Sequence, residues 1–384
     1  MTPAARYAAA AEVLDAVLDG AAAEQSLTAW ARRSRFAGSG DRAAVRDHVY
    51  DALRARASLA VLGGALSGRG LLLGLMRRSG GDAAALFGAD RFSLEALSAE
   101  EAAHLAAPEP ELPADVPEWL LPQLQADLGG EFDRYNNLLR GRAEVTLRVN
   151  AARVSVAEAA AALAAEEIAT EPHPEVETAL IVTGNPRRVQ NSAPYREGLV
   201  ELQDAGSQVV VKAVPFPGGG RVLDYCAGGG GKVLALAARG EATFFAHDGL
   251  PRRMVDLPAR AARAGVDVTC IEVPSGTYDL VLADVPCSGS GAWRRQPDAK
   301  WRMTAEGLAD LTQLQREIIA QCQAITARGG CFCYVTCSVL RAENEDQIAA
   351  TLGQSGDWEE VETRRFPVGP LQDGFFLSVF RRIV

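Results

Sequence analysis

Residues 222–233 read Val-Leu-Asp-Tyr-Cys-Ala-Gly-Gly-Gly-Gly-Lys-Val. An apolar run ends on Asp224, and a run of glycines then leads into residues with helical spacing. Glycine allows a positive φ and a close approach of the backbone to a ligand, and a helix N-terminus offers free N–H groups. A strand, an acid, glycines and a helix in this order favour a loop that binds a nucleotide-like cofactor over a merely flexible turn.

Strands and helices are expected to alternate on both sides of this loop. The expected strands are Arg221–Tyr225, Ala242–His247, Val268–Val273, Tyr278–Asp284 and Gly330–Thr336. The expected helices between them are Gly231–Ala238, Arg252–Ala264 and Ala305–Ala327. This alternation predicts an α/β fold over residues 206–384, a Rossmann-like, doubly wound parallel sheet. Such sheets bind their ligands beyond the carboxyl ends of the strands.

Three further segments precede this domain. Residues 1–79 have helical periodicity in Arg6–Leu18 and Arg42–Leu62, and we expect Ser39 or Asp41 to cap the second helix. Residues 80–140 are acidic and rich in proline, which is typical of a connector with short helices. Residues 141–205 predict a small α+β subdomain with strands Val145–Val149 and Ala179–Thr183 around the helix Val154–Glu167.

The net charge of −10 is unevenly distributed. Residues 1–79 hold 11 Lys and Arg against 7 Asp and Glu, whereas residues 80–205 hold 9 against 22. Overall acidity therefore does not exclude a nucleic-acid partner, because basic residues are locally concentrated. This basic character is either a binding surface or a solvated helix face, and comes from Arg32, Arg33, Arg35, Arg42, Arg46, Arg54 and Arg56.

Composition also predicts where the protein works. No stretch approaches 18 consecutive apolar residues, so we expect no membrane span, and residues 1–11 lack a signal pattern. We therefore expect a cytoplasmic protein. Disulfides are not expected among its seven cysteines, and a one-residue gap between Cys331 and Cys333 fits no common zinc spacing. We expect these two to be core residues and the protein to bind no metal.

Polar side chains stand where three expected strands end. Asp248 follows the second strand, as does the acid that binds ribose hydroxyls in dinucleotide folds, although it could equally cap the next helix. The strand ending at Asp284 continues as Val-Pro-Cys287-Ser-Gly, and the last strand ends as Thr-Cys337-Ser. Two thiols and a carboxylate are thus expected on the ligand side of the sheet. Basic neighbours there could lower a thiol pKa.

The loop after Cys287 contains basic and aromatic residues. Guanidinium groups bind phosphates, and tryptophan rings can stack on bases, although tryptophan more often anchors packing. The candidate RNA-contacting residues are Arg294, Arg295, Trp301 and Arg302.

At these residues the chain resembles the RNA cytosine-C5 methyltransferases, the Sun/NOL1/NOP2 family. The resemblance is strong from residue 140 onward. It is greatest to the bacterial branch that modifies 16S ribosomal RNA and carries a NusB-like helical N-terminal domain. The motifs that carry it are Asp284-x-Pro-Cys287-Ser-Gly, Thr336-Cys337-Ser with Glu343-Asn-Glu345, Leu202-Gln-Asp-x-Gly-Ser-Gln208 and the Asp224-x-Cys-Ala loop.

The resemblance implies a mechanism. Cys337 would attack C6 of cytosine, Asp284 would contact N3, and Cys287 would assist release of the product. The methyl donor would be S-adenosyl-L-methionine (SAM), and the substrate RNA, with ribosomal RNA preferred; we expect a monomer. The residues that would hold the cofactor are Asp224, Cys226, Ala227, Gly228, Gly229, Gly230, Gly231, Lys232, Asp248 and Asp284.

Two departures from the family concern the cofactor. Its loop usually reads Ala-Pro-Gly-Gly-Lys-Thr, whereas here Gly228 or Gly229 replaces the proline, so we expect a looser loop with its donors retained. The short segment Val273–Thr277 lacks the acid that faces the adenine, and Glu272 is out of register to replace it. We therefore expect weaker cofactor binding on the adenine side.

Three other functions stay open. The substrate could be tRNA. The protein could be a non-catalytic RNA-binding or assembly factor on a decayed methyltransferase scaffold, although such a factor needs no thiols at two strand ends. A methyltransferase acting on proteins or small molecules shares the fold, but not the reason for two cysteines.

Overall fold

The fold is that of a computed structural model, which describes residues 1–352 and 356–383. The chain forms two compact units. One comprises Met1–Arg142 together with Trp293–Thr304, and the other comprises Ala143–Ala292 with Ala305–Val384. The finer division at residues 79, 140 and 205 stays a prediction.

The first unit is all-α, as predicted. Its first five helices are α1 (Pro3–Leu18), α2 (Ala23–Arg33), α3 (Ser39–Arg54), α4 (Arg56–Gly63) and α5 (Gly68–Ser79). The expectation of one helix over 42–62 was wrong, because the chain leaves helical geometry at Ala55. Gly38, not Ser39, is the N-cap of α3, and the Asp41 carboxylate accepts a hydrogen bond from its N–H at 3.1 Å.

Glycine lets α4 and α5 pack in direct backbone contact. A Cβ atom at Gly63 would lie 1.8 Å from the Gly70 carbonyl oxygen, and one at Gly74 would lie 2.1 Å from the Leu59 oxygen. Buried leucine and valine side chains of all five helices fill the core around this contact. Any larger residue at either glycine would therefore separate the two helices.

The connector adds α6 (Ala99–Ala106), α7 (Leu121–Leu128) and α8 (Phe132–Leu139). Its Asp115 is fully buried and accepts hydrogen bonds from the N–H and the hydroxyl of Ser58, at 3.0 and 2.7 Å. Arg140 neutralises the same carboxylate at 2.7 Å. The acidic connector is thus held to the start of α4 by a satisfied buried charge.

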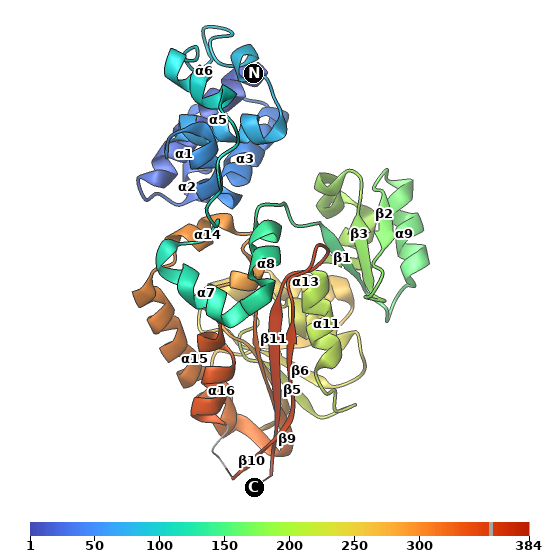
Figure 1. The fold of residues 1–384 in the computed structure, drawn as a ribbon. Helices are drawn as coiled ribbons and strands as arrows, with labels where there is room; N and C mark the ends of the chain where they lie inside the picture. Colours follow the sequence, from blue (N-terminus) through green and yellow to red (C-terminus); the bar gives the residue numbers. More distant parts are fainter. Residues whose placement is uncertain (353–355, 384) are drawn as a thin grey trace. The chain divides into compact units, whose positions relative to one another are not determined.

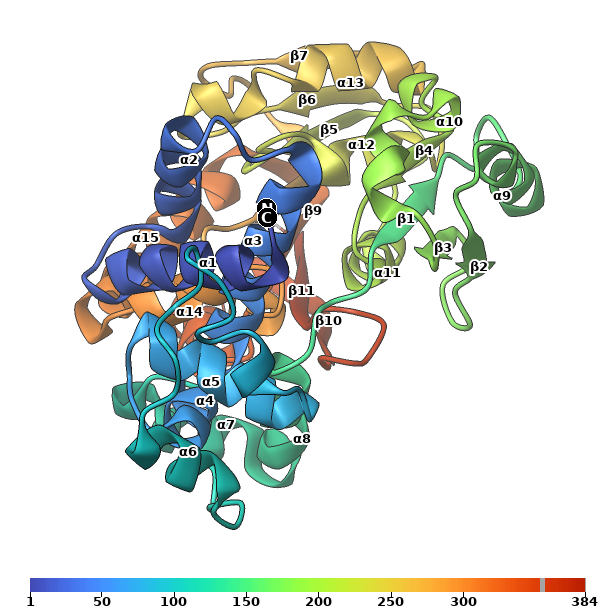
Figure 2. The same cartoon turned by 90° about the horizontal axis from the view of Figure 1, so that it is seen from above.

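The second unit begins with the small α+β subdomain (Figure 2). Its four strands are β1 (Thr146–Val149), β2 (Thr170–Pro172), β3 (Ala179–Val182) and β4 (Val200–Leu202). They pair antiparallel in the order β2-β3-β1-β4. The helices α9 (Val156–Ala165) and α10 (Ala193–Arg196) belong to the same segment.

The main sheet has seven strands in the order β10-β11-β9-β8-β5-β6-β7. Five are mutually parallel and confirm the Rossmann-like fold: β5 (Arg221–Asp224), β6 (Thr243–Ala246), β7 (Val268–Cys270), β8 (Tyr278–Asp284) and β9 (Thr326–Thr336). The prediction of a parallel sheet did not include the two strands at one edge, β10 (Trp358–Phe366) and β11 (Phe375–Arg382), which run antiparallel. Their eight-residue connection, 367–374, is too short for a parallel crossover.

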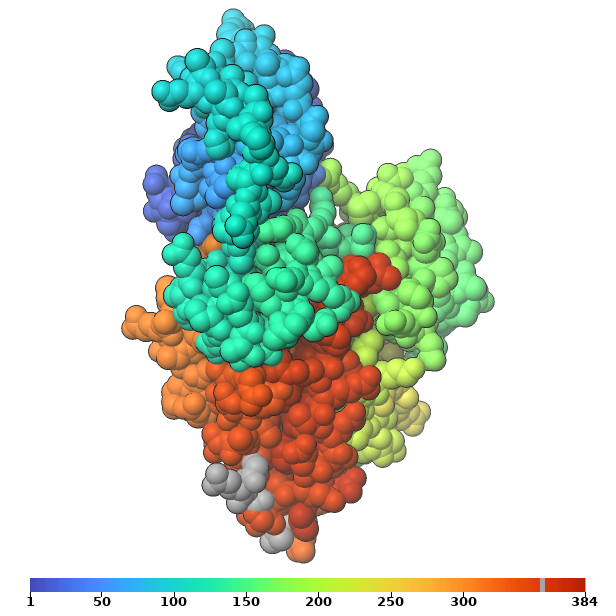
Figure 3. Space-filling view, in the orientation of Figure 1, coloured from blue at the N-terminus to red at the C-terminus, as the bar shows by residue number. Residues whose placement is uncertain are grey.

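Helices cover both faces of this sheet (Figure 1). The helices α11 (Ala205–Ala213), α12 (Gly231–Ala237) and α13 (Leu257–Ala264) share one apolar core with it. The helices α15 (Ala305–Ile325) and α16 (Glu345–Thr351) share the core on the opposite face. Most side chains of β10 are exposed, and the C-terminal strands, in red, reach the surface in Figure 3. The carboxyl ends of β5, β8 and β9 meet at one edge of the sheet.

Among the described residues, no single helix has the length and apolar character needed to cross a membrane. The pair α4 and α5 passes that test together, but the two are bent by 87°.

Candidate active site

Two thiols meet at the carboxyl ends of adjacent strands. Cys287 follows β8 and Cys337 follows β9, and their sulfur atoms lie 3.5 Å apart. The hydrogen bond to Cys337 and then burial raise the pKa of Cys287 well above its ordinary value. Either sulfur can donate the hydrogen bond between them, and the raised pKa of Cys287 favours its thiol form.

A buried carboxylate connects the two cysteine loops. Glu343 is fully buried and accepts hydrogen bonds from the Ser288 N–H at 2.7 Å and from the Ser288 hydroxyl at 2.5 Å. The Ser338 hydroxyl donates to it at 2.5 Å and the Gln315 amide at 3.1 Å. Since one of these serines follows each cysteine, Glu343 fixes both thiols through their neighbours.

Further bonds close the same network. The Gly291 N–H donates to the Cys337 carbonyl oxygen at 2.8 Å, and the Val339 N–H donates to the Ser290 hydroxyl at 2.9 Å. Asn344 accepts from the Thr336 hydroxyl at 2.6 Å. These bonds restrict the geometry of both cysteine loops, although the buried Oε1 of Gln315 has no hydrogen-bond partner.

Replacing Glu343 with Ala should lower the free energy of unfolding by about 3 kcal/mol, because it leaves several buried donors without an acceptor. Urea unfolding followed by tryptophan fluorescence measures this. Glu345→Ala is the matched control: that carboxylate pairs with Arg365 at partly exposed positions, so its loss should cost under about 1 kcal/mol. Equal losses in the two variants would contradict a structural role for the Glu343 network.

Asp284 and Lys232 form an ion pair beside the thiols. The Lys232 ammonium lies 2.6 Å from Asp284 Oδ2, and the side chain of Asp284 is 31% exposed. Burial would lower the pKa of Lys232, but attraction to Asp284 outweighs it and raises that pKa. The site thus presents a carboxylate held by a permanent cation and still reachable by a ligand.

The glycine loop starts at the end of β5. Asp224 accepts a hydrogen bond from the Val233 N–H at 3.1 Å, which joins the strand end to α12. Asp248 accepts from the N–H groups of Gly228 and Leu250, both at 2.9 Å. It thus holds the loop and caps its own turn; whether it also binds a ribose stays a prediction.

The loop has features that fit a cationic, nucleoside-containing cofactor. Asp224 Oδ1 is buried and has no hydrogen-bond partner. Burial and then the charge of Asp284 raise the pKa of Asp224 to about 7. A ligand that carries a positive charge would satisfy this carboxylate. Gly228 and Gly230 have φ of +51° and +83°, so this shape of the loop disfavours side chains there.

The departure expected on the adenine side of the cofactor site, the lack of an acid that faces the adenine, is also found in the structure. Strand β7 ends at Cys270, before the position of Glu272, whose side chain is exposed. Val273, the next residue, is 78% exposed.

Comparisons with known proteins agree with this geometry. Residues 215–379 match the family described as 16S rRNA methyltransferase RsmB/F, and residues 116–190 match the ferredoxin-like domain of the RsmF/B-like methyltransferases. The ribosomal RNA small subunit methyltransferase B of Xanthomonas campestris is 32% identical over 288 residues. The match covers 68% of this chain and 65% of that protein, slightly less than two thirds of its length.

The chain belongs to this methyltransferase family. Solved structures share the fold. A methyltransferase homologue from Pyrococcus horikoshii has a TM-score of 0.60 at 21% identity, over 70% of this chain and 95% of its own. The protein PH0851 has a TM-score of 0.74 at 20% identity, over 100% of this chain and 99% of its own. The RsmB/F match includes both cysteines, Asp284 and the glycine loop.

The candidate RNA-contacting residues belong to the helical unit. Their segment contains α14 (Pro297–Arg302), where the Lys300 ammonium and the Trp301 indole donate to the carbonyls of Arg54 and Leu53, at 2.9 and 2.6 Å. These bonds satisfy carbonyls at the end of α3, which would otherwise lack partners. Tight packing inside this unit thus occupies side chains that the sequence assigned to RNA.

Two of the four candidates are consequently poor ligands. Arg294 is 2% exposed, and Trp301 carries the guanidinium of Arg56 over its ring at 3.9 Å. Direct contact of Arg294 with phosphate, or stacking of a base on that face of Trp301, does not agree with this packing. Arg302 is exposed and Arg295 is half-buried, and both stay candidates.

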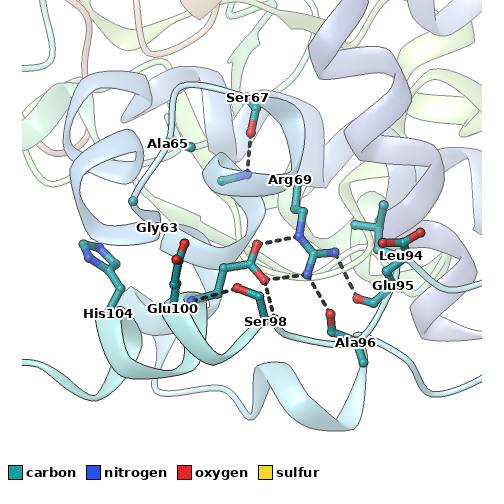
Figure 4. A pocket seen from close by; sticks show the side chains of 13 residues that line it. Gly63, Ala65, Ser67, Arg69, Leu94, Glu95, Ala96, Ser98, Glu100 and His104 are labelled. Carbon is teal, nitrogen blue, oxygen red and sulfur yellow. Dashed lines mark hydrogen bonds and ion pairs between the residues drawn. The ribbon is translucent and has the colours of Figure 1, made fainter.

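A separate hollow of about 850 Å³ lies in the helical unit near the starts of α5 and α6 (Figure 4). The charges of its Arg69 and Glu101 are paired, and Arg69 also bonds the carbonyls of Glu95 and Ala96. We therefore place no reaction there. Among the described residues, no group of three or more His, Cys, Asp or Glu side chains could hold a metal ion.

The sequence reasoning missed the residues that hold the thiols. Ser288, Ser338 and Glu343 appeared only as letters of the family motifs and were given no role, and Gln315 was not noted at all. A serine directly after each strand-end cysteine was the available signal.

Proposed function

We propose that this protein transfers a methyl group from SAM to C5 of a cytosine in RNA, with 16S ribosomal RNA as the preferred substrate. The observation that carries the proposal is the pair of thiols 3.5 Å apart beside Asp284. The family description and the name of the Xanthomonas relative support the substrate.

The glycine loop is the proposed cofactor site. When bound, SAM supplies an electrophilic methyl group on a sulfonium centre. Asp224 offers an unsatisfied buried oxygen to a cationic group of the ligand, and Lys232 keeps Asp284 in place. The N-terminus of α12, which begins at Gly231, adds N–H donors. Cys226, Ala227 and the loop glycines complete the proposed site.

Cys337 is the proposed nucleophile. Cytosine C5 is a poor nucleophile until a thiolate adds at C6, and the C6–S bond then makes C5 enamine-like. The methyl group is taken up at C5 while Asp284, near N3, stabilises charge that develops on the ring. Transfer of the C5 proton to water, with breakage of the C6–S bond, restores the 5,6 double bond and releases the Cys337 thiolate.

Cys287 is the proposed partner in that last stage. Its high pKa keeps it a thiol beside the Cys337 sulfur. A thiol 3.5 Å from the Cys337 sulfur can donate a hydrogen bond to it and would so favour its departure as a thiolate. The target base would have to leave any helical stack to reach both sulfurs.

Incubation of the purified protein with labelled SAM and undermethylated 30S particles, free 16S rRNA or tRNA tests the proposal. Label should enter 16S rRNA as 5-methylcytosine. Label on tRNA alone would favour the tRNA alternative. Absence of label on every RNA, together with measurable RNA binding, would favour a non-catalytic assembly factor.

The helical unit provides a second support for an RNA partner. Arg32, Arg35 and Arg42 are exposed around the α2–α3 connection, where Phe36 is 77% exposed. We call Arg32–Arg42 the basic tip. Its one acid, Asp41, already binds the N-terminal ammonium at 3.1 Å and Arg6 at 2.8 Å. Guanidinium groups around an exposed aromatic ring suit single-stranded RNA.

Replacing Arg35 and Phe36 together with Ala should weaken RNA binding about tenfold and reduce its salt dependence, because a phosphate contact and a stacking face are lost. Filter binding at several salt concentrations measures both effects. Arg91→Ala with Phe92→Ala is the matched control: it removes another exposed Arg–Phe pair, beside Asp90 and Glu95. Equal weakening by both double variants would rule out a specific role of the basic tip.

We also expect a monomer in the cytoplasm, because this enzyme would act on nascent ribosomal subunits.

A further inference from the structure

The glycine loop is held from its outer side by charged residues of the same unit. The Gly229 carbonyl oxygen accepts a hydrogen bond from the Arg260 guanidinium, which is also bonded to Glu201. Arg260 belongs to α13 and Glu201 to β4, so two elements distant in sequence meet at this carbonyl.

The guanidinium occupies the space that a side chain in the loop would need. A Cβ atom at Gly229 would lie 2.6 Å from Nη1 of Arg260. The related proteins usually carry a proline in this loop, and here Gly228 or Gly229 stands in its place. Arg260 therefore restricts from outside a loop that has lost the internal restraint of a proline ring.

The carbonyl of Gly231, two residues after Gly229, is also held by side-chain donors. The Gly231 oxygen accepts from Arg148 Nη1 at 2.7 Å and from the Gln203 amide at 3.0 Å. In a trans peptide the carbonyl and the following N–H point in opposite directions, so these donors fix the direction of the Lys232 N–H. That N–H is one of the donors that the start of α12 offers to a ligand.

We propose that Arg260, oriented by Glu201, is a positioning residue that replaces the missing proline and preorganises the four-glycine loop for SAM. The proposal rests on SAM as cofactor of the proposed function. Four successive glycines have more conformational freedom than any other tetrapeptide, and a loop that orders only on binding loses affinity. A fixed external donor removes much of that cost.

Arg260→Ala is the test, with Arg263→Ala as its matched control. Arg263 pairs with the same Glu201 and lies over the Tyr195 ring at 4.4 Å, but it donates no hydrogen bond to the loop. Arg260→Ala should raise the Kd for SAM and for S-adenosylhomocysteine about tenfold, as loss of a charge-assisted hydrogen bond does. It should leave kcat at saturating SAM near the wild-type value. The Arg263→Ala variant should bind SAM with the wild-type Kd. An equal rise of the Kd in both variants would mean that it comes from the loss of any ion pair with Glu201, not from the bond to the loop.

A double-mutant cycle with Gly229→Ala measures whether Arg260 acts at this loop position. In the presence of Arg260 the new methyl group displaces the guanidinium, so Gly229→Ala should weaken SAM binding. In the Arg260→Ala background, Gly229→Ala should raise the Kd for SAM little further. Additive losses would overturn the proposal, because they would show that the two positions act independently.

Hydrogen exchange of residues 227–233 without any ligand separates this proposal from the proposed function. Arg260→Ala should speed exchange of the loop amides, and Arg263→Ala should not. Unchanged exchange would overturn the positioning role. Faster exchange in a protein whose wild type binds no SAM would support the positioning role and contradict the proposed cofactor.

Discussion

Replacing Cys337 with Ala should abolish methyl transfer to RNA, with a loss of at least about 10⁴-fold, because the proposed nucleophile that adds to C6 of the base is removed. The fold should persist, since the change removes one half-buried sulfur from a loop whose backbone is held by Gly291 and Ser290. SAM binding should also persist, because Asp224, Lys232 and the glycine loop stay unchanged. Label incorporation into 16S rRNA and calorimetric titration with S-adenosylhomocysteine measure the two properties separately.

Cys331→Ala is the matched control for this variant. Cys331 lies on the same strand, β9, is also half-buried and packs at the edge of the apolar core. Its replacement should leave methyl transfer near the wild-type rate. Residual transfer by Cys337→Ala above a tenth of the wild-type rate would exclude Cys337 as the nucleophile, and with it the covalent route.

Replacing Cys287 with Ala should trap a covalent complex between protein and RNA. The variant retains the Cys337 nucleophile and can form the C6–S bond, but it lacks the thiol that lies 3.5 Å from the departing sulfur. Methyl transfer to C5 precedes this stage, so the trapped RNA should carry the methyl group. Denaturing gel electrophoresis of the protein with 16S rRNA and labelled SAM should show a slowly migrating band that disappears on nuclease treatment.

The double replacement of Cys287 and Cys337 controls this experiment. It should form no complex, because the bond to the base requires the Cys337 sulfur. A complex that survives in the double variant would place the covalent bond on another residue. Absence of a complex with Cys287→Ala alone, together with lost turnover, would mean that Cys287 acts before or during attack instead of at release.

Much of the main domain could be predicted from sequence because local patterns specify it. Buried parallel strands appear as short apolar runs, and polar residues mark the ends of three of them: Asp224 and Asp284 end β5 and β8, and Cys337 follows β9. The carboxyl ends of parallel strands meet at one edge, so the meeting of these side chains followed from the strand assignment alone. The β10–β11 hairpin was not predicted, because most β10 side chains are exposed and it lacks a continuous apolar run.

The N-terminal unit shows the limit of local patterns. The periodicity of residues 42–62 is helical throughout, yet the chain turns at Ala55 because α4 must meet α5 along its glycines. Likewise, Arg294 and Trp301 look like RNA ligands by residue type. Arg294 is buried, however, and the Trp301 indole donates to the Leu53 carbonyl at the end of α3.

The sequence alone therefore specified the Rossmann-like fold and the presence of Cys287, Cys337, Asp284 and the glycine loop at the carboxyl ends of its strands, because each depends on residue type and strand position. The tertiary structure was needed for what holds these groups in place: the 3.5 Å contact of the two sulfurs, the Glu343 network behind both thiols, and Arg260 behind the glycines. Most of these contacts join residues far apart in the chain, such as Gly229 and Arg260, 31 positions apart, or Glu201 and Arg260, 59 positions apart. Such distances arise only when burial and charge pairing fold separate segments against one another.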